Sequence, residues 1–220
     1  MDTIVIIIIA VTCIISYLAL NDMRMFEKYK FNVGAILHRK EYFRLLTAGF
    51  LHADFMHLLL NMYVLYMFYP PIMAAFGVVG FLIIYIASIL LGNLFSLLIY
   101  KNQSWYSAIG ASGGVAGIIF ASVSLNPVFS KIGIIFIPFL SIPGYIFGLL
   151  YFGYSVYSML KPRSNDNVGH AAHLGGAFFG LIYTVIIYPE DAIHNMFYLL
   201  IMSLPLIYLA YEIFVRKRIG

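Results

Sequence analysis

The sequence predicts an all-α fold of the polytopic helical membrane class, and three observations predict it. Of the 220 residues, 63% are hydrophobic and 10% are charged, whereas a soluble domain is roughly 25% charged. Several apolar stretches approach the about 20 residues that a spanning helix needs. The regular alternation of apolar and polar residues typical of a transmembrane β-barrel is not seen. A soluble enzyme, a nucleic-acid-binding module and a disordered chain are therefore excluded, and no nucleic-acid partner is expected.

Seven stretches are candidate spanning helices, and helix-breaking residues set several of their limits. Pro70 and Pro71 predict the end of the second stretch, Pro127 the end of the fourth, and Pro189 the end of the sixth. The stretches cover residues 3–20, 55–69, 76–100, 112–125, 132–160, 168–188 and 192–215.

The first stretch, residues 3–20, has two possible interpretations. It could be a signal peptide, but no basic residue precedes it and no small-residue cleavage site follows it, which favours a retained helix. We therefore expect a single integral membrane domain over residues 1–220. It would comprise a core over about 1–190 and an additional C-terminal helix over about 192–215.

The connection over residues 21–54 is too long for a turn and mixes aromatic with basic residues. That composition predicts a segment that lies in the membrane interface rather than in water. If the stretches alternate in direction, all but one of the 13 Lys and Arg residues lie on the side of this connection, and the exception is Lys131. The positive-inside rule would make that side cytoplasmic.

Polar residues within the stretches are candidate functional residues, because ionisable groups at membrane depth are costly. Ser112 begins the fourth stretch inside Gly-Ala-Ser-Gly, with Gly110 before it and Gly113 after it. The first turn of a helix offers unpaired N–H groups and the positive end of the helix dipole, which suit an oxyanion. Small residues also let a neighbouring helix approach closely, and this motif taken alone is better explained by packing.

The sixth stretch carries His170 and His173 beside a face of small residues. His173, Gly176 and Gly180 share one helical face. If this face packs against the helix of Ser112, the hydroxyl and the imidazole come within hydrogen-bonding reach. A serine activated by a histidine base is the minimal machinery for acyl transfer. No acidic residue lies deep in a stretch, so the pattern predicts a Ser–His dyad, although a single intramembrane histidine can also be structural.

The start of the second stretch adds His52, His57 and Asn61. His57 and Asn61 are four residues apart and share a helical face. Both side chains can donate hydrogen bonds, so they could supplement the Ser112 backbone N–H as an oxyanion hole. A bond between helices explains Asn61 equally well. His52 is directed away from that face, and we expect it to hold the loop in place.

Together these three groups resemble the rhomboid intramembrane serine proteases. The matching pieces are His52-x4-His57-x3-Asn61, Gly110-Ala-Ser112-Gly and Ala172-His173-Leu-Gly-Gly-x3-Gly180. They occur in the order and spacing of that family, and the resemblance covers residues 42–188. Each motif alone is weak, whereas the set is highly specific.

The resemblance implies a nucleophile at Ser112, a general base at His173 and an oxyanion hole from Ser112, His57 and Asn61. It implies that Arg44 anchors the first connection, with Phe43 before it in place of the usual Trp. It also implies a core of six helices, with the last stretch as a seventh.

The chain departs from the family pattern in two respects. The position four residues after the serine is often an aromatic that stacks under the histidine, but here it is Ala116. The imidazole must then be oriented by close packing or by His170. Family proteases open to the non-cytoplasmic side, which conflicts with the positive-inside rule. We expect the non-cytoplasmic side, because an interfacial connection can hold its cations against lipid phosphates.

The function implied is that of an intramembrane serine endopeptidase, with transmembrane proteins as substrates and the lipid bilayer as partner. Neither a metal nor another cofactor is expected, since Ser–His chemistry needs none. Residues 132–160, with Pro138 and Pro143, are expected to form a lateral gate, and residues 161–167 a covering loop. One alternative is a catalytically inactive rhomboid-like protein that binds membrane-protein clients. A transporter or channel is a third reading, which leaves the serine unexplained.

Overall fold

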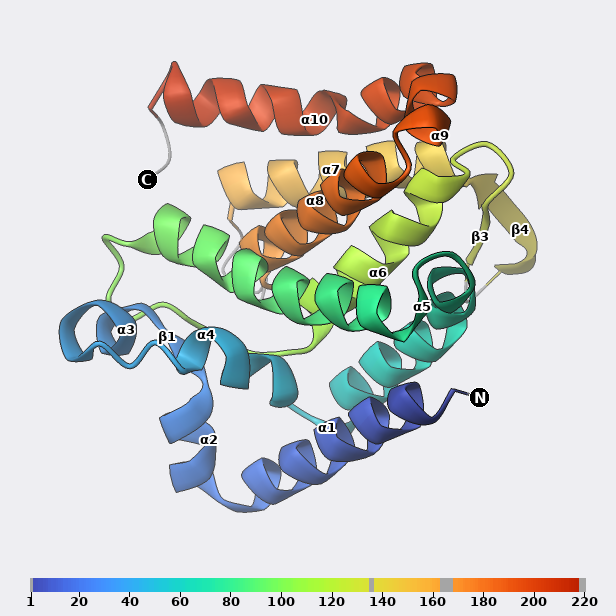
Figure 1. Cartoon of the computed structure of the whole chain (residues 1–220). Helices are drawn as coiled ribbons and strands as arrows, with labels where there is room; N and C mark the ends of the chain where they lie inside the picture. Colours follow the sequence, from blue (N-terminus) through green and yellow to red (C-terminus); the bar gives the residue numbers. More distant parts are fainter. Residues whose placement is uncertain (1, 135–136, 163–167, 218–220) are drawn as a thin grey trace.

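The computed structural model describes residues 2–134, 137–162 and 168–217 (Figure 1). Its main helices confirm the all-α membrane class. The helices long and apolar enough to cross a membrane are α1 (Thr3–Asn21), α5 (Phe55–Tyr100), α8 (His170–Ile187) and α10 (Met196–Phe214). Between them lie the shorter helices α6 (Ser112–Leu125), α7 (Gly144–Leu160) and α9 (Pro189–His194).

Helix α5 corrects the predicted break between the second and third stretches. The helix runs through Pro70 and Pro71 and changes direction at Gly77, where φ is 63°. Prolines are tolerated inside membrane helices when neighbouring groups satisfy the freed carbonyls. A positive φ is readily adopted only by glycine, so Gly77 divides α5 into a first arm (55–76) and a second arm (78–100).

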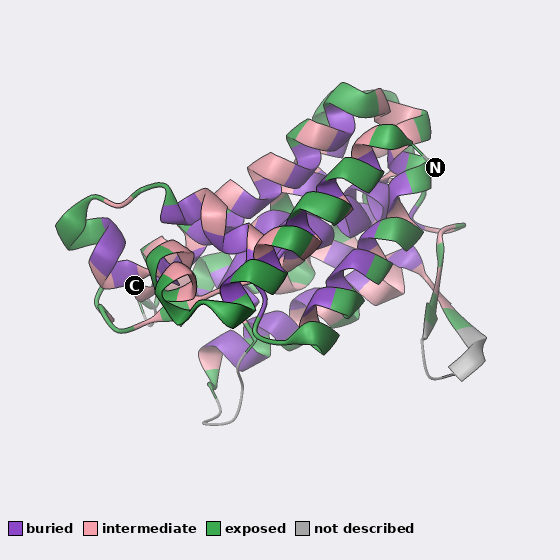
Figure 2. Ribbon diagram, turned by 90° about the horizontal axis from the view of Figure 1, so that it is seen from below, coloured by how far each residue is buried: buried purple, intermediate pink, exposed green. Residues whose placement is uncertain are grey.

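The fifth stretch, residues 132–160, is not the single membrane segment that the sequence predicts. Strands β3 (Lys131–Ile134) and β4 (Ile137–Pro143) form an antiparallel hairpin, and α7 begins only at Gly144. Pro143 lies directly before the helix with φ of −56° and ψ of 146°, and its ring fixes φ near this value. The hairpin projects from the side of the bundle (Figures 1 and 2). The helical part of the predicted gate is therefore α7 alone.

The predicted C-terminal helix over about 192–215 is divided in two: Pro189 starts the short helix α9, and the long helix α10 begins only at Met196. Proline is favoured in the first turn of a helix, where its missing N–H would be unpaired. Helix α9 ends before Asn195, and α10 then packs against α7. Near the end of α10, Glu212 is fully buried and accepts hydrogen bonds from Tyr208 and Arg216.

The connection between α1 and α5 folds into short elements: α2 (Met23–Tyr29), β1 (Phe31–Asn32), α3 (Val33–Arg39), α4 (Arg44–Thr47) and the 3-10 turn η1 (Ala48–Phe50). Strand β1 pairs with β2 (Ser107–Ala108), which lies in the loop before α6. A small apolar cluster, including Phe31, Val33 and Ile36, packs under them. The connection is thus tied to the loop that leads to Ser112.

Helix α6 lies at the centre of the bundle, and nearly all of its residues are buried (Figure 2). It packs against α8 and the second arm of α5. A Cβ atom added at Gly176 would collide with the carbonyl oxygen of Gly113, and one added at Gly180 with that of Gly117. The two predicted small-residue faces therefore meet backbone to backbone.

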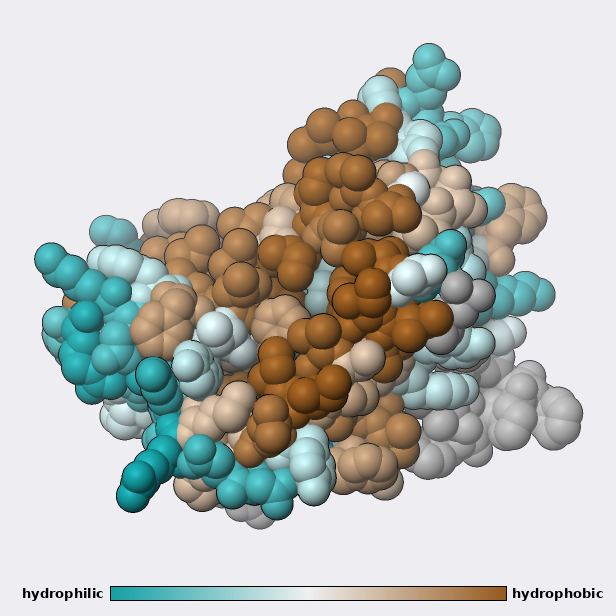
Figure 3. Space-filling model, turned by 60° about the horizontal axis from the view of Figure 1, so that its bottom comes forward, coloured by the Kyte–Doolittle hydropathy of each residue, from teal (hydrophilic) through white to brown (hydrophobic). Residues whose placement is uncertain are grey.

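The outer surface is apolar, as a bilayer requires. Figure 3 shows hydrophobic side chains over most of one face, with hydrophilic groups gathered toward its edges. Large side chains such as Ile14, Leu98 and Ile186 are exposed on α1, α5 and α8. Apolar patches of this extent on a monomer mark contact with lipid or protein, and the chain is an integral membrane protein.

We predict that Gly180→Ala lowers the stability of the protein by about 1–3 kcal/mol, because the added methyl group overpacks the contact with Gly117. The measurement is thermal unfolding of the purified protein in detergent. The control is Gly153→Ala in α7, where the nearest atom to an added Cβ is 3.9 Å away. That variant should be neutral or slightly stabilised, and equal melting temperatures for the two variants would contradict the packing argument.

Candidate functional site

The site is built around Ser112 and His173. Ser112 is the first residue of α6 and His173 lies in the first turn of α8. The glycine contacts bring these helix ends together, and Ser112 Oγ lies 2.6 Å from His173 Nε2. In the tautomer with its proton on Nδ1, Nε2 accepts the hydrogen bond that the hydroxyl donates. The predicted pair is therefore in the geometry needed for a base to take the serine proton.

Tyr151 of α7 provides the aromatic neighbour of His173 that Ala116 does not. The two rings are stacked, with centroids 6.4 Å apart and planes inclined by 25°. Sequence reasoning missed Tyr151, because it lies on a different helix from Ser112 and no spacing connects them. The only available signal was the density of aromatic residues in residues 145–157.

His170 occupies a buried position one turn before His173, with 5% of its surface exposed. Its ring meets Tyr154 of α7 edge-on at 5.4 Å and lies 6.4 Å from the ring of His173. Both histidines of α8 thus face aromatic residues of α7. His170 therefore lies in the same group of rings as His173, and a role in orienting the imidazole stays a prediction.

Gly110 lets the His57 ring approach the serine. A Cβ atom added at Gly110 would lie 3.0 Å from Cε1 and Nε2 of His57 and 3.4 Å from the Ser112 hydroxyl oxygen. The same residue has φ of 123°, a conformation that a side chain strongly disfavours. Only glycine fits this position without strain, and the structure places His57 beside Ser112 as predicted.

The start of α5 orients the His57 ring. Asp54 caps the helix by accepting a hydrogen bond from the His57 backbone N–H at 2.8 Å, as N-cap residues commonly do. The backbone N–H of Ala53 donates to His57 Nδ1 at 3.4 Å. Because Nδ1 accepts, the ring proton lies on Nε2, the ring nitrogen that borders Gly110. His57 therefore presents a donor at this point.

Asn61 lies one turn further along α5 and is buried. Its side-chain Nδ2 donates to the His57 carbonyl oxygen at 2.9 Å. This bond uses one of the two N–H donors of the amide, and the second N–H is left for another acceptor. The structure thus places Asn61 on the same helix face as His57, with its amide held by the His57 carbonyl.

His52 links three segments of the protein through a series of hydrogen bonds in which each donor has an acceptor. The backbone N–H of Ala111 donates to His52 Nε2 at 3.3 Å, so the ring proton lies on Nδ1. Nδ1 lies 2.8 Å from Ser16 Oγ on α1, and Ser16 in turn donates to the Phe50 carbonyl oxygen at 2.8 Å. The imidazole is fully buried. These contacts are those of a residue that holds the loop, as expected.

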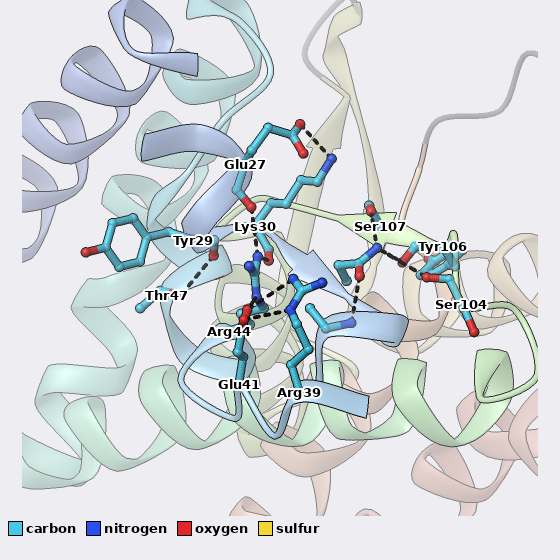
Figure 4. A network of polar contacts seen from close by, with 12 residues as sticks. Glu27, Tyr29, Lys30, Arg39, Glu41, Arg44, Thr47, Ser104, Tyr106 and Ser107 are labelled. Carbon is cyan, nitrogen blue, oxygen red and sulfur yellow. Dashed lines mark hydrogen bonds and ion pairs between the residues drawn. The ribbon is translucent and has the colours of Figure 1, made fainter. Parts of the chain in front are cut away.

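Arg44 ties together the connection between α1 and α5 (Figure 4). Its side chain is buried, donates to the carboxylate of Glu41 at 2.6 Å, and donates to the carbonyl oxygens of Glu27 and Lys30 at 2.8 Å each. Hydrogen bonds from Arg39 and Arg44 hold the pKa of Glu41 at about 2. The carboxylate therefore stays charged near neutral pH, and the contacts of Arg44 are those of an anchor.

Comparison with known proteins agrees with this geometry. The family model for the Rhomboid domain matches residues 39–190, which is more than half of the chain and contains Ser112, His173 and every other site residue that the sequence predicts. The protein belongs to the rhomboid family.

Curated relatives carry names of the same family. The chain is 30% identical over 148 residues to "RHOMBOID-like protein 12, mitochondrial" of Arabidopsis thaliana, covering 60% of this chain and 43% of that protein. It is 30% identical to the human "Presenilin-associated rhomboid-like protein, mitochondrial", covering 63% and 36% respectively. "Rhomboid-related protein 1" of Caenorhabditis elegans is 28% identical, covering 72% and 43%. The chain spans less than half the length of these relatives.

We predict that His52→Ala lowers stability by about 1–3 kcal/mol, because it leaves the buried Ala111 N–H without its acceptor. Thermal unfolding in detergent measures the loss. Ser16→Ala leaves the buried His52 Nδ1–H without its acceptor and should cost a similar amount, about 1–3 kcal/mol. A His52→Ala variant as stable as the wild type would show that the imidazole does not hold the loop.

Proposed function

We propose that the protein is an intramembrane serine endopeptidase that hydrolyses peptide bonds in or beside transmembrane segments of other membrane proteins. The observation that supports it most directly is the 2.6 Å separation of Ser112 Oγ and His173 Nε2. This pair lies at the N-terminal end of α6, beside backbone donors that an oxyanion needs. Membership of the rhomboid family supports the same assignment.

In this proposal Ser112 attacks the scissile carbonyl while His173 takes the hydroxyl proton. His173 then returns that proton to the leaving amine, and water hydrolyses the acyl-enzyme by the reverse sequence. A substrate helix hides its carbonyls in its own hydrogen bonds. Local unwinding must precede attack, so small or helix-breaking residues near the scissile bond should favour cleavage.

The proposed oxyanion hole combines the Ser112 backbone N–H with the Nε2–H of His57. The Ala111 N–H already donates a hydrogen bond to His52, so it is not available as an oxyanion donor. Asn61 joins through the N–H of its amide that the His57 carbonyl does not accept. A ligand that resembles the tetrahedral intermediate should draw this N–H into place.

Substrate access is proposed beside α7, whose Tyr151 and Tyr154 border the two histidines of α8. The predicted covering loop cannot be placed, because residues 163–167 lie outside the described residues. We propose that the site faces the non-cytoplasmic side, as the family resemblance implies. Accessibility mapping of single cysteines introduced in residues 23–47 tests this, and labelling from the cytoplasmic side would reverse the orientation.

We predict that a fluorescent fluorophosphonate labels the purified protein and that Ser112→Ala and His173→Ala abolish the labelling. Each variant should also lose cleavage of a transmembrane reporter in liposomes by at least about a thousandfold. Ser124→Ala, on the same helix and away from the histidine, is the matched control. Absence of labelling in a folded wild type would instead support an inactive rhomboid-like protein that binds membrane clients.

We predict that Tyr151→Leu slows labelling on the order of tenfold, because the imidazole loses its stacking partner and its orientation. Tyr151→Phe keeps a ring and should restore the wild-type rate. Tyr157→Leu, at an exposed position of the same helix, controls for general damage to α7. Equal rates for the Leu and Phe variants, at equal melting temperatures, would rule out a positioning role.

A further inference from the structure

A groove of about 610 Å³ lies between the second arm of α5, α8 and α10, and the site above does not use it. Its walls are apolar and include Phe95 and Ile99 of α5, Phe178 of α8 and Leu206 of α10. Leu174, which directly follows His173 in α8, also lines it. The volume falls in the usual range for sites of small molecules, about 300–1,000 Å³.

Two lysines line the same groove. Lys101 follows the end of α5, and Lys217 follows the end of α10. These two helix ends lie on the same side of the bundle (Figure 1). Both side chains are exposed, and no ion pair joins either ammonium group to a carboxylate in the part of the chain that the structure describes. The neighbouring Arg216 differs, since it is paired with the buried Glu212.

We propose that this groove binds an anionic phospholipid. One acyl chain lies between α5, α8 and α10, and the headgroup phosphate lies between the ammonium groups of Lys101 and Lys217. Large side chains at the rim, among them Leu98 and Phe178, are exposed to the bilayer, so lipid is the molecule with direct access. A lysine near an anionic membrane surface contributes about 1 kcal/mol of attraction. Two of them above an apolar groove match a molecule with one negative head and an apolar tail.

The proposed lipid would stabilise the arrangement of the catalytic helix. Helix α8 already packs closely on α5 at Gly175, where an added Cβ would lie 2.9 Å from Gly92 Cα. The opposite wall of the groove is α10, which among the described residues packs mainly against α7. A bound acyl chain fills the space between them and adds contacts that exist only in the folded state, so binding raises the melting temperature. This inference does not depend on the proposed protease activity.

The test uses the full-length protein in a neutral detergent, and it measures melting temperature during titration with phosphatidylglycerol or phosphatidylcholine. We expect phosphatidylglycerol to raise the melting temperature at lower concentration than phosphatidylcholine. In Lys101→Gln/Lys217→Gln the apparent affinity for phosphatidylglycerol should fall on the order of tenfold or more. Lys131→Gln, on the β3–β4 hairpin, should leave it unchanged.

A second variant tests the acyl chain separately from the charge. Ala210→Phe places a ring in the groove and should weaken both lipids, with the preference between them retained. Equal affinity of wild type for the two lipids, or unchanged binding in either groove variant, would overturn the proposal. Stabilisation by a transmembrane peptide but by neither lipid would also overturn it, because the groove would then accept a helix.

Discussion

The backbone contact between α6 and α8 is the constraint on which the site depends. Gly113 and Gly117 face Gly176 and Gly180 so closely that no side chain fits between them. In a bilayer, where helices gain little from excluding lipid, such packing is a main source of association. The same contact fixes the distance between Ser112 and His173, which lie at the adjacent ends of the two helices. The stability of the bundle and the proposed chemistry therefore share one interface.

The polar groups of the connection between α1 and α5 form a second layer of support. His52 links α1, the η1 turn and the residue before Ser112 through bonds in which each donor has an acceptor. Arg44 donates hydrogen bonds to two carbonyl oxygens and a carboxylate. Buried polar networks are favourable only when fully satisfied. Here the satisfied hydrogen bonds hold the loop before α6. Gly110 in that loop leaves room for the His57 ring beside Ser112.

Helix α7 stands apart from this rigid centre. It packs mainly against α10 and less against α6 and α8, yet it supplies Tyr151 to the face of His173. A displacement of α7 would withdraw the ring from the imidazole and open the side of the site at once. In the proposed function, substrate entry and the orientation of the general base would thereby be coupled through the side chain of Tyr151. A lipid bound in the apolar groove between α5, α8 and α10, as proposed, would likewise act on the position of α8.

Local sequence determined the membrane class, the approximate extents of α1, α6 and α8, and the pairing of Ser112 with His173. These follow from apolar length and from small residues at helical spacing, which depend on neighbours along the chain. The sequence did not predict that α5 would continue through Pro70 and Pro71, because neighbouring groups in the folded bundle decide whether freed carbonyls are satisfied. It likewise gave no sign of the β3–β4 hairpin, since its apolar residues suit a strand as well as a helix.

Tertiary structure alone decided which aromatic residue meets His173. Ala116 left that place open, and Tyr151 fills it from a helix that is distant in sequence. It also decided the orientation of Asn61 and the groove beside α10, because each depends on how separate helices lie against one another. The sequence specifies the chemistry of each side chain, whereas packing across the bundle determines which partner that side chain contacts.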